Sequence, residues 1–269
     1  MATTVADIVR ILETLASPSL AETWDNVGLQ VGDPRRTVTT VWTALDPAPR
    51  VIRAACDARV DLLVTHHPLI FRALNRIDGA TPQGASILDA VTHGVAIYAM
   101  HTNFDAAAGG LNDVLAKRIG LKRVEPLGVE AGALSGASRI GRVGRIAPGL
   151  SVRALAQVVK RKLLIDRVRV AGDPGMRIER VALVAGSGGS LLSHFLQSPA
   201  ELFITGDLRY HDAREIEAAG KAAIDIGHFH SEQMMAADVA VRLQRRLQRR
   251  RPPVHVEACT LEHDPFLFL

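Results

Sequence analysis

"DLLVTHHPLIF", residues 61–71, is the stretch that decides the fold of this chain. Residues 61–65 have the run of apolar side chains that is typical of a buried strand, and the run stops at two adjacent histidines and a proline. Neighbouring side chains on an extended strand point to opposite faces. Using both imidazoles at one site therefore requires a turn at Pro68 or two metal ions side by side. The alternative is a pair of loop histidines bonded to backbone carbonyls.

Strand-like and helix-like segments alternate around this stretch. The predicted strands and helices are residues 37–46 (strand), 49–60 (helix), 61–65 (strand), 84–94 (helix), 95–100 (strand) and 109–120 (helix). This order predicts an α/β fold with a mainly parallel sheet and helices on its faces.

The same pattern recurs later in the chain. "RVALVAGSGGS" (180–190), "AELFITGDLRYHDA" (200–213) and "AAIDIGHFHSE" (222–232) again read as strands that end in polar loops. Between the two series, at residues 128–149, the composition shifts to Gly, Ser, Ala and Arg, which indicates a domain boundary. We therefore predict two α/β halves.

The bulk composition excludes several classes of protein. Aromatic residues make up only 4% of the 269 residues, which disfavours a reader of single-stranded nucleic acid. Much of the net charge of +4 lies in "RLQRRLQRRR" (242–251), which predicts a solvated helix face. Met235, Val239, Leu243 and Leu247 would form its buried stripe. DNA binding through these arginines is a weaker alternative, so a nucleic-acid partner is not expected.

The location of the protein is predicted from what the sequence lacks. It contains two cysteines, no C-x-x-C motif, no N-terminal signal peptide and no apolar run long enough to span a bilayer. At the N-terminus, Thr4 and Asp7 have the spacing of a helix capping box. We expect a cytoplasmic protein without a membrane partner.

Chemically active residues follow four of the predicted strands. They are His66 and His67, "HTNFD" (101–105), "TGD" (205–207) and "GHFHSE" (227–232). Right-handed crossovers bring the carboxyl ends of parallel strands to one edge of a sheet, where ligands bind in α/β proteins. The sequence thus predicts a binding site at this edge.

Imidazoles and carboxylates in these loops suit a divalent metal. Asp105 is either a ligand or a helix cap, and His228 and Glu232 are four residues apart, so they would share a helix face. His230 can take the place of His228, because H-x-E is also a ligand spacing. This mixture suits zinc, manganese, iron, cobalt or nickel. Five or more ligands exceed what one catalytic zinc takes and fit two ions about 3.5–4 Å apart.

Six stretches of the sequence together resemble the Nif-three-like dinuclear metal-centre family, some members of which are labelled GTP cyclohydrolase I type 2. In chain order they are "ETWDNVGLQVGD" (22–33), "THHPLIF" (65–71), "HTNFDAAAGGLND" (101–113), "SGGS" (187–190), "TGDLRYHDA" (205–213) and "GHFHSE" (227–232). The combination is specific and covers most of the chain.

The resemblance implies a fold and an assembly. It implies two interlinked α/β domains with a metal cleft between them, which we assign to residues 1–126 with 226–269 and to residues 127–225. It also implies a toroidal homohexamer, and the short stretch at residues 128–149 is similar to the compact form of the family, which has no inserted domain.

The resemblance also implies the ligands of two divalent metal ions, with Glu232 as the bridging carboxylate. The implied ligands are His66, His67, Asp105, His228 and Glu232.

Further residues are candidates for substrate contact or proton transfer. Asp25 would line the cleft or form an Asx turn. Ser187, Gly188 and Gly189 would hold a phosphate or form a tight turn. His101 and His211 are the candidate catalytic residues, as proton carriers, and the alternatives are a supporting partner of the metal site for His101 and a surface residue for His211.

Two classes of function remain open. The first is a metal-dependent hydrolase that attacks a nucleotide or another phosphate-containing substrate through a bridging hydroxide, with ring opening of GTP as one case. The second is a non-enzymatic regulatory scaffold or metal-delivery protein. Closed coordination by protein ligands would favour the second.

Overall fold

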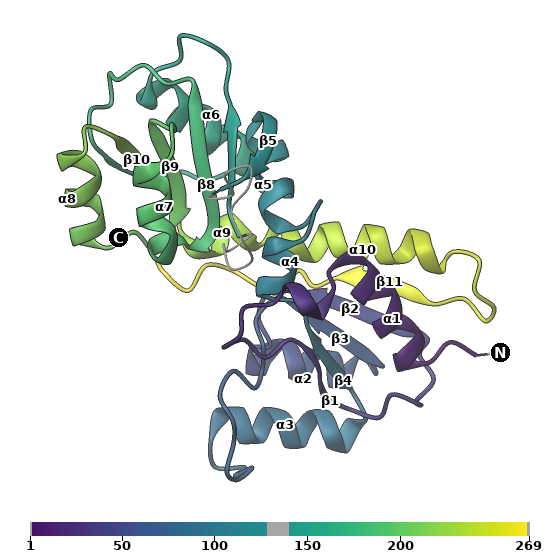
Figure 1. Cartoon of the computed structure of the whole chain (residues 1–269). Coiled ribbons are helices and arrows are strands. Elements are labelled where there is room, and N and C mark those ends of the chain that lie inside the picture. Colours follow the sequence, from purple (N-terminus) through teal and green to yellow (C-terminus); the bar gives the residue numbers. More distant parts are fainter. Residues whose placement is uncertain (1, 128–139, 268–269) are drawn as a thin grey trace. The chain divides into compact units, whose positions relative to one another are not determined.

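The computed structural model describes residues 2–127 and 140–267, which form two compact units. Unit 1 comprises Met1–Ala107 and Met235–Leu269, and unit 2 comprises Ala108–Met234. Both contain a sheet with helices packed on it, so the predicted α/β class is confirmed (Figure 1). Residues 128–139 of the expected boundary stretch lie outside the described residues.

Unit 1 contains a five-stranded sheet in the order β1-β4-β3-β2-β11. Its strands are β1 (Gly28–Val31), β2 (Thr40–Ala44), β3 (Leu62–Thr65), β4 (Ala96–Ala99) and β11 (His255–Ala258). Four of them run parallel, and β1 pairs antiparallel with β4. Its helices are α1 (Val5–Leu15), η1 (Pro18–Leu20), α2 (Pro49–Asp57), α3 (Pro82–His93), α4 (Thr102–Ala106) and α10 (Met234–Leu247).

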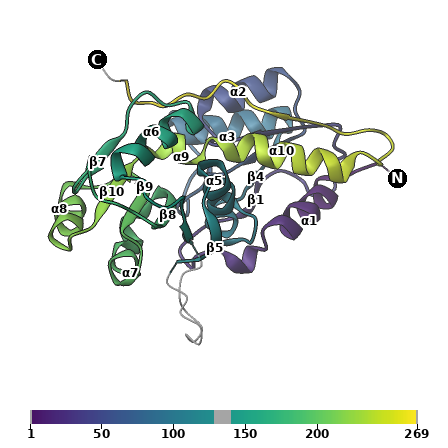
Figure 2. The same cartoon turned by 90° about the horizontal axis from the view of Figure 1, so that it is seen from above.

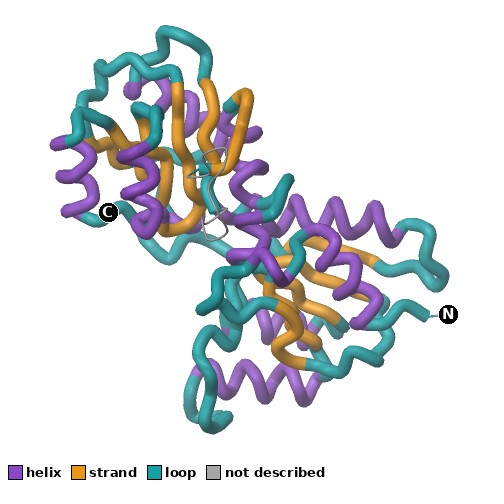
Figure 3. Tube along the Cα trace, viewed as in Figure 1, coloured by secondary structure: helices purple, strands orange, loops and turns teal. Residues whose placement is uncertain are grey.

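Helices cover both faces of the unit 1 sheet (Figures 1 and 3). On one face, α2 and α3 bury Ile52 and Ile87 against Leu63 and Ile97 of the central strands. On the other face lie α1 and α10. The predicted stripe of α10 is confirmed, because Met235, Val239, Leu243 and Leu247 are all buried. The predicted capping box of α1 is present as well.

Unit 2 contains a six-stranded mixed sheet in the order β5-β6-β8-β9-β10-β7. Its strands are β5 (Lys122–Pro126), β6 (Arg142–Arg145), β7 (Arg169–Ala171), β8 (Arg180–Ser187), β9 (Leu202–Gly206) and β10 (Ala222–Asp225). The central strands β8, β9 and β10 are parallel. Its helices are α5 (Leu111–Ile119), α6 (Val152–Leu163), η2 (Gly188–Leu191), α7 (Leu192–Gln197), α8 (Tyr210–Ala218) and α9 (His228–Glu232). Figure 2 shows them from above.

The two sheets share one topology, which confirms the internal repeat predicted from the sequence. Strands β1-β4-β3-β2 correspond to β7-β10-β9-β8, with the first strand antiparallel to the second in both cases. The details repeat too. Asp61 accepts hydrogen bonds from the amides of residues 39 and 40, and Glu201 accepts them from the amides of residues 179 and 180. A carboxylate therefore anchors the start of the first parallel strand in each half.

The boundaries of the two units, after residues 107 and 234, differ from those of the expected domains, after residues 126 and 225. Strand β5 pairs with β6, and α5 packs against α6 and β8, so residues 108–126 lie in unit 2. Helix α9 packs on β8 and β9, also in unit 2. The two units therefore exchange a helix. Helix α5 comes after β4 and α4 of unit 1 in the chain but belongs to unit 2, and α10 comes after β10 and α9 of unit 2 but belongs to unit 1.

Candidate metal centre

The turn at the end of β3 brings both predicted histidine ligands to one side of the chain. The backbone amides of His66 and His67 both donate to the carbonyl of Leu45, at 3.1 and 3.0 Å. Two successive amides can share one acceptor only if the extended chain has bent. The two imidazole rings lie 5.1 Å apart between centroids. The bend thus removes the opposite-face problem that the sequence raised.

Hydrogen bonds at Nδ1 fix the orientation of these two rings. His66 is fully buried, and its Nδ1 lies 2.8 Å from the carbonyl oxygen of Met100. A carbonyl only accepts, so Nδ1 carries the proton and the lone pair of a neutral imidazole lies on Nε2. The Nδ1 of His67 lies 2.7 Å from Oδ1 of Asp46, which has the same effect. Both rings therefore offer Nε2 as a ligand atom.

His101 has the same arrangement at the start of α4. Its Nδ1 lies 2.9 Å from Oδ1 of Asp25. The other carboxylate oxygen of Asp25 accepts hydrogen bonds from the amide and the hydroxyl of Thr102. Burial alone would raise the pKa of Asp25, but the hydrogen bonds from His101 and Thr102 outweigh it and lower the pKa to about 2. Asp25 is therefore ionised at neutral pH and holds the Nδ1 proton of His101.

Unit 1 contains a group of side chains that could hold a metal ion. Candidate donor atoms of His66, His67 and His101 lie within 4.8 Å of one another. Nε2 of His66 lies 3.8 Å from Oδ1 of Asp105, the fourth residue of α4. That distance is too long for a hydrogen bond. Two ligand atoms that each lie about 2.1 Å from one zinc-sized ion can be up to about 4.2 Å apart. The distance between His66 and Asp105 therefore fits two ligands of one ion.

Unit 2 contains two candidate ligands of its own on α9. Nε2 of His228 lies 3.0 Å from Oε2 of Glu232, and its Nδ1 lies 2.7 Å from Oδ2 of Asp207. Two ligands at right angles around one ion are also about 3.0 Å apart. The predicted sharing of one helix face by His228 and Glu232 is thus observed.

Two glycines of unit 2 make room for α9. A Cβ on Gly186 would lie 2.2 Å from Oε1 of Glu232, and one on Gly206 would lie 2.7 Å from the amide nitrogen of His228. The amide of Gly186 also donates to Oγ of Ser231 at 2.8 Å. The strand ends of β8 and β9 therefore pack directly against the helix that carries both ligands.

Sequence analysis did not identify the partners of the imidazoles. Asp46 follows β2, and its signal is the dipeptide Asp-Pro at a strand end, which is common in ordinary turns. Asp207 ends the "TGD" loop, and nothing in that loop points to His228 as its partner. Gly186 precedes the predicted phosphate loop, and its close contact is Glu232. Long-range pairs of this kind leave no spacing pattern in one sequence.

The remaining predicted residues are placed as follows. The amide of Gly188 donates to Oγ1 of Thr205 at 2.9 Å, so it already has an acceptor. Ser187 is exposed and Gly189 partly buried, at the start of η2. His211 is exposed near the N-terminus of α8. His230 is partly buried, and its Nδ1 lies 3.3 Å from Nε2 of Gln233.

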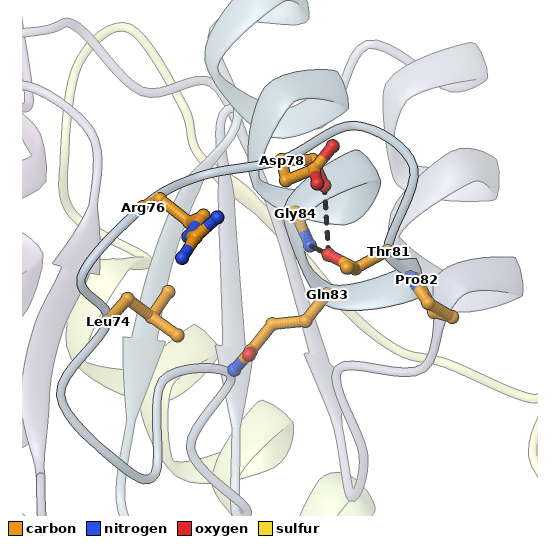
Figure 4. Close-up of a pocket in the computed structure, with 7 residues that line it drawn as sticks. All are labelled: Leu74, Arg76, Asp78, Thr81, Pro82, Gln83 and Gly84. Atoms are coloured by element: carbon orange, nitrogen blue, oxygen red, sulfur yellow. Dashed lines mark hydrogen bonds between the residues drawn. The ribbon is translucent and has the colours of Figure 1, made fainter.

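A cavity of about 600 Å³ lies in the loop before α3 (Figure 4). Its wall includes Arg76, and the hydroxyl of Thr81 bonds the backbone of Asp78 and Gly84. None of the predicted site residues lines it. A second cavity of about 230 Å³ is lined mainly by prolines, including the residues that follow Asp46 and His67 in the chain.

The sequence profile of the family described as Duf34/NIF3 (NGG1p interacting factor 3) matches residues 3–265. The chain belongs to the Duf34/NIF3 family. The resemblance found in the sequence is therefore confirmed. Within residues 2–127 and 140–267, no helix combines the length and the apolar composition needed to cross a membrane.

Relatives within the Duf34/NIF3 family match nearly full length. A Clostridium perfringens protein named GTP cyclohydrolase 1 type 2 homolog is 34% identical over 268 residues, which cover 98% of each chain. The Schizosaccharomyces pombe protein NIF3 homolog is 32% identical, over 86% of this chain and 85% of its own. The crystal structure of Staphylococcus aureus hypothetical protein SA1388 aligns over both whole chains, with a TM-score of 0.89 and 29% identity.

Proposed function

We propose that this Duf34/NIF3 protein is a metal-dependent hydrolase that binds two divalent ions and acts on a nucleotide or another phosphate-containing substrate. Its ligands would be His66, His67 and Asp105 of unit 1 with His228 and Glu232 of unit 2. The observation that carries the proposal is the fixed tautomer of the imidazoles. Nδ1 of His66 lies against a carbonyl and Nδ1 of His67 against a carboxylate, so the lone pair that each ring would offer to a metal lies on Nε2.

Divalent ions held by these residues would act as Lewis acids and would lower the pKa of bound water, so that hydroxide would be available at neutral pH. The surrounding residues support this chemistry. Asp46 and Asp207 orient His67 and His228, and the absence of a side chain at Gly186 leaves room for Glu232 on α9. His101 would carry a proton on Nε2, because Asp25 holds its Nδ1 proton and would stabilise the imidazolium.

Two substrate types fit this proposal. The names of the relatives support ring opening of GTP, which needs a proton donor beside the base, and His101 or His211 would serve. Hydrolysis of a phosphoester needs a phosphate contact, for which Ser187 and Gly189 are candidates. The two ions would be zinc, manganese, iron, cobalt or nickel, because histidine and carboxylate ligands bind all of these metals.

A non-enzymatic scaffold or metal-delivery protein is the second candidate. Burial favours it, because His66, Asp105 and Glu232 are each no more than 6% exposed. Structural metal sites are closed by protein ligands, and catalytic ones keep an open position. Activity assays separate the two, because a scaffold binds metal without turnover.

The decisive experiment combines elemental analysis with a substrate panel. Purified protein would be assayed with GTP, nucleoside monophosphates and a generic phosphodiester, each with added metals. We expect about two ions per chain and a loss of both metal and activity in His66→Ala and in Glu232→Ala. His93→Ala, which removes an exposed histidine of α3, is the control. Full metal content and full activity in both variants would refute the ligand assignment.

The assembly is proposed from the resemblance. A homohexamer would have six times the chain mass of 28.9 kDa. Sedimentation velocity at several concentrations tests this directly, and a stable monomer or dimer would contradict it.

A further inference from the structure

Two large aromatic side chains of unit 1 are exposed beside the histidine cluster. Trp24 is 57% exposed and Phe71 is 45% exposed. Their ring centroids lie 5.9 Å apart, with the planes at 65°. A flat ligand that stacks on one of these rings would therefore present its edge to the other. We call Trp24 and Phe71 the aromatic pair.

The aromatic pair adjoins His101. The ring centroid of His101 lies 6.1 Å from that of Trp24 and 6.4 Å from that of Phe71. His101 in turn lies 5.2 Å from His66 and 5.5 Å from His67, between centroids. A ring bound against the aromatic pair would thus lie next to the residues to which we assign the chemistry.

Hydrogen bonds fix the loop that carries Trp24. On one side of Trp24, the amide of Glu22 donates to Oγ1 of Thr102 at 3.0 Å. On the other side, Asp25 binds both His101 and Thr102. Trp24 is therefore exposed on a loop that is bonded at both ends to the start of α4.

A second set of hydrogen bonds joins this loop to the one that carries Phe71. The side chain of Asn26 donates to the carbonyl of Ile70. Oε1 of Gln30 accepts from the amide of Ile70 at 2.8 Å, and Nε2 of Gln30 donates to the carbonyl of Asn26 at 2.6 Å. The two loops that carry the aromatic residues are thus joined before any ligand arrives, which lowers the entropic cost of binding.

We propose that the aromatic pair binds a planar nitrogen heterocycle, the base of a nucleotide, and that Trp24 and Phe71 select substrates by stacking. This inference rests on the proposed function, because it names the substrate class of the same site. Stacking on aromatic side chains tolerates any base, since every base has a π-face. Phosphate esters without an aromatic ring gain nothing from it, so they would bind more weakly.

The test measures binding without turnover. Calorimetric titrations with guanosine 5′-monophosphate, adenosine 5′-monophosphate and ribose 5-phosphate would be made on metal-loaded and chelator-treated protein. We expect both nucleotides to bind and ribose 5-phosphate to bind at least about 10-fold more weakly. Trp24→Ala and Phe71→Ala should each weaken nucleotide binding by about 10-fold, and Trp24→Phe should retain most of it.

Tyr210→Ala is the matched control, because Tyr210 is 73% exposed on α8 of unit 2 and lies outside the aromatic pair. Fluorescence gives a second readout. The chain has two tryptophans, so quenching present in the wild type and absent in Trp24→Phe reports contact at Trp24.

Three results would overturn the inference: no nucleotide binding by the wild type, equal binding of ribose 5-phosphate, or a change of oligomeric state in Trp24→Ala with unchanged nucleotide affinity. The last would identify the aromatic pair as a subunit contact. Hydrolysis measured separately tests the proposed function. If nucleotide binding depends on Trp24 but no turnover is found, this inference stands and the proposed function fails. If turnover is found but nucleotide binding does not depend on Trp24, only this inference is refuted.

Discussion

Oδ1 of Asp46 lies 2.7 Å from Nδ1 of His67, and the two residues follow the parallel neighbours β2 and β3. This pair shows how two neighbouring strand ends together orient a candidate metal ligand. One strand end supplies the imidazole, and the next supplies the carboxylate that sets its tautomer. In unit 2 the pair of Asp207 and His228 does the same after β9 and β10.

The first prediction concerns Asp46. Replacing it with alanine removes the acceptor of the Nδ1 proton, so His67 can rotate or change tautomer. Loss of such a partner lowers metal affinity by about 10- to 100-fold. We expect this for Asp46→Ala in calorimetric titrations with zinc and manganese. Asp33→Ala, at an exposed aspartate paired with Arg35, should leave the affinity unchanged. Equal affinities in the two variants would show that Asp46 does not support a ligand.

A second prediction tests the contact between Gly186 and Glu232. Gly186→Ala places a methyl group where Oε1 of Glu232 lies, at a backbone φ of +64°. Gly220→Ala is the control, because its φ is +67° and nothing lies within 4 Å of the added Cβ. Both changes carry the left-handed backbone cost of about 1–2 kcal/mol. We expect Gly186→Ala alone to lose metal affinity and to lose more stability in urea denaturation. Matching behaviour of the two variants would contradict the contact.

The third prediction separates two roles of His101. We expect His101→Gln to retain the metal and to lose most of any hydrolase activity, since general acid–base catalysis contributes about 10²- to 10⁴-fold. Elemental analysis and initial rates at several pH values measure the two properties. If the variant loses metal in parallel with activity, His101 is a ligand instead.

A fourth prediction concerns the C-terminal segment. The carboxylate of Glu262 accepts hydrogen bonds from the amides of Leu45 and Asp46, at 2.8 and 2.6 Å. Glu262→Ala leaves both donors without this acceptor and frees the loop that holds Asp46. We expect a loss of about 1–3 kcal/mol in the free energy of unfolding and weaker metal binding. Unchanged values of both would show that the segment has no such role.

The fifth prediction concerns the pH dependence that Glu262 contributes. Burial raises the pKa of its carboxyl group, and the hydrogen bonds from the amides of Asp46 and Leu45 only partly oppose this. The folded state therefore binds the proton more tightly than the unfolded state. The stability contribution is full below the unfolded pKa and is lost as the pH rises through the folded pKa. We expect wild-type stability to fall relative to Glu262→Gln as the pH rises just above 4.5. A parallel or opposite trend would contradict the direction of the shift.

Local patterns in the sequence predicted most of the fold. Buried strands such as β3, the capping box at Thr4 and the stripe of α10 each follow from neighbouring residues, so a single sequence reveals them. The repeat was also visible, because its strand ends carry similar polar loops. The boundaries of the units were not visible in the sequence, because they depend on whether α5 packs on α6, a helix that begins 33 residues after α5 ends.

The candidate site was predictable to a similar degree. His66 and His67 stand out because an apolar strand ends on them. Their hydrogen-bond partners do not stand out, because Asp46 and the carbonyl of Met100 come close to the two histidines only when the strands are paired. The aromatic pair was missed for the same reason. Trp24 and Phe71 are 47 positions apart in the sequence, and only the folded loops bring them together.

The exchange of α5 and α10 has a consequence for dissecting the protein. A fragment that ends at Ala107 would lack α10 and β11, so the edge of β2 and the part of the sheet that α10 covers would be open to water. A fragment that begins at residue 120 would lose α5 from the side of β8. Each of these two fragments lacks elements that cover its sheet, so we expect both to be insoluble, whereas a fragment of residues 108–234 retains all elements of unit 2.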